Sequence, residues 1–167
     1  MKYEFAPDIQ NIAEDVIKHL FPFINAGRVK CYRSYGSKAK GTIARCHALG
    51  KLMQKALGVQ PFYPLEFISE QFDSLDNEDK IETIIHELMH IPKCFGGGFR
   101  HHNYVNEKNV EKCVKLYKMK KSKEHSKDFI QGINFQEEKD KGIDKGRRKK
   151  DSSKNKPKNN MLSKWFS

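Results

Sequence analysis

Two histidines and a glutamate lie close together in the middle of the chain, in the run His86-Glu87-Leu88-Met89-His90. This run has the pattern HExxH. On a helix, residues four positions apart share a face, so the imidazoles of His86 and His90 can converge on one ion. Glu87 projects in another direction and can act as a general base that deprotonates water for attack on a peptide carbonyl. The pattern predicts a zinc-dependent hydrolytic site; the alternative is a helix that carries two histidines without a metal.

A catalytic zinc site needs a third protein ligand, and the residues after the HExxH run offer several. A glycine turn, Gly96 to Gly98, can fold the chain back toward the helix, and two histidines follow it. A glutamate on the next helix is the alternative. The four candidate ligands are His101, His102, Glu107 and Glu111. An electrophile that stabilises the oxyanion is also expected, and its candidates are Tyr104, Arg100 and His101.

The elements that position this site follow from the apolar pattern. A helix is expected from Pro7, which suits a first turn, to Leu20, before Pro22. The helix with the HExxH run begins in an acidic turn at 74–77 and stops at Ile91, because Pro92 follows. A third helix is expected from about Val105 to Tyr117.

Strands are expected between the first two helices. Residues 28–35 alternate as a strand with one buried face, and 42–49 could be a second strand. Residues 51–57 either continue that strand or form a short helix. The prolines of segment 61–68 favour a sheet edge, where the segment around Phe62 to Phe67 could hold a substrate as an added strand. The order of elements predicts an α+β domain.

Charge is distributed unevenly along the 167 residues. The whole chain carries a formal net charge of +11, but residues 1–117 hold 16 basic and 14 acidic residues, whereas 118–167 hold 16 basic and 7 acidic residues. A globular domain over residues 1–120 is therefore expected, followed by a disordered lysine-rich linker over 121–158 and a terminal motif over 159–167. The four cysteines form no CxxC pair, and no apolar run reaches the length of a membrane span. We expect a soluble cytoplasmic protein with reduced thiols.

The run HELMHIPKCFGGGFRHH, from His86 to His102, resembles a family of predicted zincin metallopeptidases of archaea and phages, distantly similar to the SprT/Spartan proteases. The segment PFYPLEFI that precedes it fits the same family, and the resemblance covers roughly residues 5 to 117. It implies one catalytic Zn²⁺ and favours His102 over His101 as the third ligand. It also implies a minimal zincin fold: a first helix, an active-site helix beneath a small, mostly antiparallel sheet, and a backing helix.

The tail carries two further features. The basic cluster Arg147, Arg148, Lys149 and Lys150 is either a solvated run or a nonspecific contact to a DNA backbone. The end of the chain resembles the PCNA-interacting peptide of sliding-clamp partners, with Asn159 in place of the usual glutamine. The matching residues are Asn159, Leu162, Trp165 and Phe166. This motif could instead dock on the protein's own domain or have no role, and the apolar stretch 129–135 is left without an assignment.

Together these features predict a zinc endopeptidase that acts on a protein or peptide substrate. The resemblance to Spartan implies digestion of proteins crosslinked to DNA, with the sliding clamp and DNA as tethers and a nucleoid-associated location. One alternative is a catalytically idle zincin that binds DNA or the clamp as an adaptor. Another is a housekeeping peptidase whose basic tail is incidental.

Overall fold

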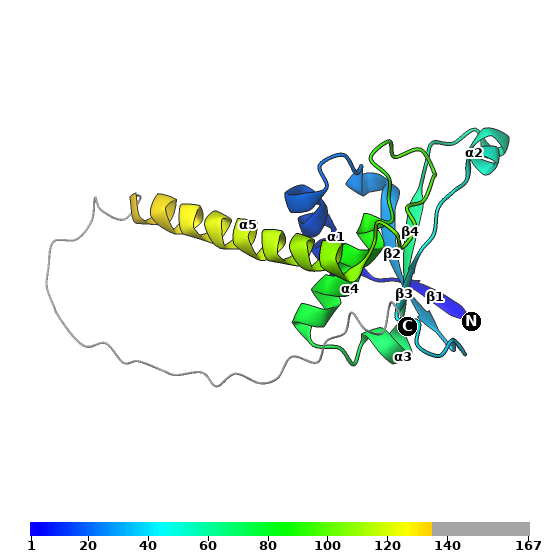
Figure 1. Cartoon of the computed structure of the whole chain (residues 1–167), viewed down its shortest axis with the longest axis horizontal. Coiled ribbons are helices and arrows are strands. Elements are labelled where there is room, and N and C mark those ends of the chain that lie inside the picture. The colour runs from blue at the N-terminus through cyan, green and yellow to red at the C-terminus, as the bar shows by residue number, and fades with distance from the viewer. Residues whose placement is uncertain (135–167) are drawn as a thin grey trace, which may run out of the picture.

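The computed structural model describes the backbone of residues 1–134 and the side chains of residues 1–126. Figure 1 shows a small sheet with helices α1 and α4 and the first part of α5 on one side of it. The described elements, in chain order, are β1 (Lys2–Phe5), α1 (Pro7–Leu20), the 3₁₀ turn η1 (Ala26–Arg28), β2 (Val29–Tyr35), β3 (Ala44–Cys46), α2 (Lys51–Leu57), β4 (Tyr63–Ile68), α3 (Ser69–Phe72), α4 (Asn77–Met89) and α5 (Glu107–Asn134). This arrangement confirms the predicted α+β class.

Helix α1 has the predicted bounds and lies against the sheet through its apolar stripe. Ile9, Ala13 and Val16 are buried on that stripe. Gln10 is buried among them, and its amide group satisfies two backbone groups of the neighbouring strand: Nε2 donates to the Val29 carbonyl, and Oε1 accepts from the Cys31 amide. The helix is therefore joined to β2 by hydrogen bonds as well as by apolar packing.

The sheet has the strand order β1-β2-β4-β3. β1 pairs antiparallel with β2, β2 pairs parallel with β4, and β4 pairs antiparallel with β3. Segment 61–68 therefore does not form an edge, and that prediction was wrong. Pro61 precedes the strand, and Pro64 lies at its beginning, where its carbonyl accepts from the His47 amide and no donor is required of it. The edge beside β4 belongs to β3.

Two predictions between the helices are refined, and one strand before α1 is new. β3 is only three residues long, although its ladder continues outward through the hydrogen bond from the Leu49 amide to the Phe62 carbonyl. Residues 51–57 form helix α2, which ends at Gly58 in the left-handed conformation. In Figure 1, α2 forms the outer tip of the segment that joins β3 to β4, away from the body of the domain. β1 was not predicted.

Helix α4 contains the HExxH run. Its N-cap is Asp76, whose side chain accepts from the Asp79 amide, and Glu78 and Asp79 occupy the first turn, where acidic residues are favourable. The helix ends at Met89, two residues before the predicted end, with His90 as its C-cap. Every residue from Thr83 to Met89 is buried, because α4 packs against the sheet at β3 and against helices α1 and α5.

Helix α5 continues far beyond Tyr117, where the sequence predicted its end, and beyond residue 120, where a linker was expected. It reaches Asn134. Polar contacts to α1 accompany the extension: Tyr117 and Lys121 both contact the carboxylate of Asp15, and Glu124 lies 2.8 Å from the ring of His19. The basic cluster 147–150 and the motif 159–167 lie outside the described residues. Within the described part, no helix combines the length and the apolar character needed to cross a bilayer.

Candidate metal centre

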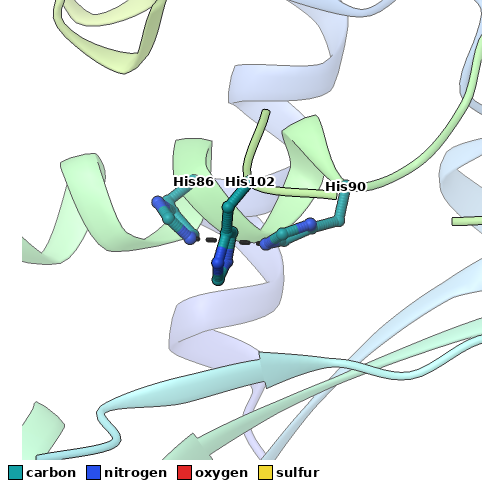
Figure 2. A group of neighbouring side chains, drawn as sticks. All are labelled: His86, His90 and His102. Atoms are coloured by element: carbon teal, nitrogen blue, oxygen red, sulfur yellow. Dashed lines mark hydrogen bonds between the residues drawn. The ribbon is translucent and has the colours of Figure 1, made fainter. Parts of the chain in front are cut away.

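His86 and His90 point toward each other from one face of α4, as Figure 2 shows. Their Nε2 atoms lie 3.3 Å apart, and both residues are buried. Two ligand atoms bound at about 2.0–2.1 Å to a tetrahedral ion lie about 3.3–3.4 Å apart. The separation of the two imidazoles therefore already matches the spacing that a shared ion requires.

The orientation of His90 is set by the segment that follows the glycine turn. Its Nδ1 lies 2.6 Å from the carbonyl oxygen of Arg100, and the Arg100 amide donates to the His90 carbonyl. A backbone carbonyl can only accept, so Nδ1 carries the proton and Nε2 keeps its lone pair. The ring of Phe99 stacks on that of His90, with centroids 4.7 Å apart. His90 is thus held in the tautomer that suits a metal ligand.

His102 is the third histidine of the group. The ligand nitrogens of His86, His90 and His102 all lie within 4.8 Å of one another, and the three rings converge in Figure 2. His102 itself is exposed to solvent, as are its neighbour His101 and the two glutamates considered as alternatives. Among the described side chains, His101, Glu107 and Glu111 do not belong to this group. Glu111 instead pairs with Lys115 at 2.7 Å.

The glycine turn is fastened to the rest of the domain by two side chains from elsewhere in the chain. The Tyr63 hydroxyl accepts from the Gly97 amide at 2.8 Å and donates to the Gly98 carbonyl at 3.1 Å. Gln54 of α2 donates to the carbonyls of Leu49 and Gly96. Gly97 has φ +82°, and a Cβ there would lie 2.0 Å from the Gln54 amide nitrogen and 2.4 Å from the Leu49 carbonyl. Only glycine fits, and the turn that carries Phe99 and His102 is held in place.

The electrostatic surroundings of His86 and His90 favour the neutral form of these two buried imidazoles. Burial, together with the smaller effect of the neighbouring rings of His90 and His102, lowers the pKa of His86 to about 3. Burial also lowers the pKa of His90, although the hydrogen bond to Arg100 opposes this. A neutral imidazole is the form that binds a metal ion.

Glu87 is buried beside the histidines. Burial raises the pKa of its carboxyl group to about 8, although a hydrogen bond from the Cys46 backbone and the charge of Arg45 act in the opposite direction. Within the part of the chain that the structure describes, its Oε1 atom has no hydrogen-bond partner. A buried carboxylate oxygen without a partner is costly. An oxygen atom in this position is free to accept a hydrogen bond from a water molecule or a proton from the substrate.

A cleft of about 640 Å³ opens over the site. His86, Glu87, His90 and His102 line one side of it. The other side is formed by β3 and the segment before it, including Arg45, Cys46 and His47. Residues 43, 47 and 49 hydrogen-bond to β4. Because alternate residues of an antiparallel strand face opposite neighbours, the backbone groups of Ala44 and Cys46 face the open edge. Within the part of the chain that the structure describes, no strand pairs with this edge, although the Cys46 amide donates to Glu87.

A family model described as "Putative phage metallopeptidase" matches residues 1–133. The chain belongs to this family. No curated protein and no solved structure matches the chain. The match covers most of the described residues, including α5 almost to its end.

Membership of a metallopeptidase family implies a metal ion, and the residues present fit one. The three nitrogens converge, the two buried imidazoles are neutral, and the separation of their Nε2 atoms suits a shared ion. The possible site is His86, His90 and His102. A bound ion of this kind polarises a carbonyl oxygen and acidifies water.

Two of the oxyanion candidates, Arg100 and Tyr104, contact each other. Arg100 lies over the ring of Tyr104, 4.3 Å from its centroid, and neither residue lines the cleft among the described side chains. Arg45 and His47 line it instead. Both contact the buried Glu66 carboxylate, His47 at 2.8 Å and Arg45 at 3.4 Å. The sequence offered no indication of them, because their place at the cleft depends on β3 being the edge strand.

Proposed function

We propose that the protein is a zinc-dependent endopeptidase. His86, His90 and His102 would hold the ion, which fits a site made only of imidazoles. The observation that carries the proposal is the convergence of the three nitrogens beside a buried carboxylate, in a cleft that the edge strand β3 borders. A helix with two histidines but no metal would not need that combination.

The residues of the chain divide the work of hydrolysis. The substrate would add as a strand along the edge of β3, where the Ala44 backbone groups and the Cys46 carbonyl would bind it and fix its position. Glu87 would take a proton from the attacking water and then give it to the leaving amine. A group that must accept and later release a proton is served by a carboxyl whose pKa is raised from its usual range, as burial provides for Glu87.

The variant Glu87→Gln tests the chemistry directly. The amide keeps the size of the side chain but cannot accept the proton, so hydrolysis of an unfolded protein such as casein should fall by about 10²–10⁴-fold. Zinc content and thermal stability should stay close to those of the unchanged protein. Full proteolysis by Glu87→Gln in the presence of zinc would rule out the mechanism. Zinc-free protein with undiminished activity would rule out the metal.

The finer role that we propose is digestion of proteins bound or crosslinked to DNA, as in Spartan-like proteases. Its support is the sequence of the tail: the basic cluster 147–150 and the clamp-peptide-like residues Asn159, Leu162, Trp165 and Phe166. A tether of this kind raises the local concentration of the protease without altering its active site. Deletion of residues 159–167 should abolish binding to a sliding clamp. Unchanged clamp binding, or none by the full chain, would remove this role and leave a general peptidase.

A further inference from the structure

A second pocket lies beside the metal cleft and shares one residue with it. Its volume is about 490 Å³, and most of its walls are apolar: Ala48, Leu49, Val59, Phe62 and Pro64. His47, Gln60 and Arg28 complete the lining. His47 lines both pockets. The second pocket thus borders, at His47, the cleft in which the proposed hydrolysis takes place.

The two pockets lie on opposite faces of the sheet. On β4, the side chains of Tyr63 and Leu65 are fully buried in the core beneath α4. Successive side chains of a strand point to opposite faces, so Pro64 points the other way. Residue 47 pairs with residue 64, and residue 49 pairs with residue 62. Paired residues point to the same face of the sheet, so the side chains of His47 and Leu49 lie on the same face as that of Pro64. The second pocket therefore opens on the face away from the HExxH helix.

A peptide added to the edge of β3 would present side chains to both faces in turn. Where it passes Cys46, whose backbone contacts Glu87, the peptide bond lies over the catalytic residues. The neighbouring peptide residue that points to the other face then stands at the level of His47 and Leu49. That is the mouth of the apolar pocket.

We propose that this pocket selects a large apolar side chain, such as leucine, methionine or phenylalanine, within two residues of the bond that is cleaved. The inference rests on the proposed peptidase function and on substrate addition at β3. The volume of the pocket exceeds what one such side chain needs.

The test compares quenched fluorescent peptides that differ only at positions near the cleaved bond, with cleavage sites assigned by mass spectrometry. The full chain should cleave a peptide with leucine at the selected position about 10–200-fold more efficiently, in kcat/KM, than one with alanine. Val59→Asp should remove most of that preference. Val59 is 47% exposed, so the change is compatible with folding. Leu52→Asp, on α2 at 80% exposure and outside the pocket, is the matched control and should keep the preference.

Binding supplies a second readout that does not depend on turnover. In the Glu87→Gln background, the leucine peptide should bind more tightly than the alanine peptide, and Val59→Asp should remove the difference. Cleavage without any apolar preference near the bond, or a preference unchanged by Val59→Asp, would overturn this inference and leave the peptidase intact. Absence of cleavage by the zinc-loaded full chain would overturn the proposed function and the inference together.

Discussion

The described part of the chain holds two groups of side chains whose nitrogen and oxygen atoms are close enough to share an ion. One is His86, His90 and His102, and the other is Asp15, His19 and Glu124. In the first group two members are buried, and the imidazoles face one another. In the second, all three members are partly exposed, and lysine ammonium groups already lie against both carboxylates: Lys121 at Asp15 and Lys18 at Glu124.

The difference between the two groups shows that proximity alone does not define a metal site. Burial favours the uncharged form of an imidazole, and this is the form that binds a cation. The carboxylates between α1 and α5 are neutralised by cations that belong to the chain, so an ion would have to displace lysines. We interpret the first group as a metal centre and the second as a polar clasp that holds α5 against α1.

Removing one residue from each group gives the largest contrast. His90→Ala deletes a proposed ligand. It should weaken zinc binding by more than the about 10–100-fold that is typical when a residue supporting a ligand is lost. His19→Ala deletes the histidine of the polar clasp and should leave zinc binding unchanged. Competition with a chromophoric chelator measures both. Equal losses of affinity in the two variants would show that the groups have been distinguished wrongly.

A smaller effect is expected where the glycine turn is fastened. Tyr63→Phe removes the hydroxyl that bonds to Gly97 and Gly98 but keeps the aromatic ring that packs on Phe95. Zinc affinity should fall by about 10-fold, because the turn that carries His102 loosens, and excess zinc should restore activity. A drop in melting temperature with unchanged zinc affinity would mean that Tyr63 stabilises only the fold.

The smallest effect is expected at the polar clasp, and it depends on pH. Burial alone would raise the pKa of Asp15, but hydrogen bonds from Tyr117 and Lys121 lower it overall. A carboxyl group with a lowered pKa stabilises the fold above its unfolded pKa of about 4 and loses that contribution as the pH falls further. Asp15→Asn should therefore cost about 1 kcal/mol at pH 7. Thermal unfolding from pH 7 to pH 3 should show the gap closing; a gap that widens in acid would contradict the clasp.

The same contrast explains what the sequence could predict. Helices α1 and α4 were predicted because their apolar stripes and caps are local. β1 was missed because all four of its residues are exposed, so no buried face marks it. The length of α5 was missed because its added turns contact α1 through polar groups such as Glu124. Polar contacts of this kind produce no helical repeat of apolar residues in the sequence.

The site divides in the same way. His86, Glu87 and His90 follow from a spacing within one helix. The residue pattern alone did not decide between His101 and His102 as the third ligand, and only the family resemblance favoured His102. The contacts that hold the glycine turn join residues 34 to 42 positions apart, and the cleft wall depends on which strand lies at the edge. Such long-range pairings cannot be inferred from local patterns.

The identity of the third ligand is tested most directly by the zinc content of three proteins after dialysis against a weak chelator: the unchanged chain, His102→Ala and His101→Ala. The two histidines are adjacent and both exposed, so each variant controls for the other. We predict about one zinc ion per chain in the unchanged protein and in His101→Ala, and little or none in His102→Ala. Zinc retained by His102→Ala but lost from His101→Ala would contradict the account.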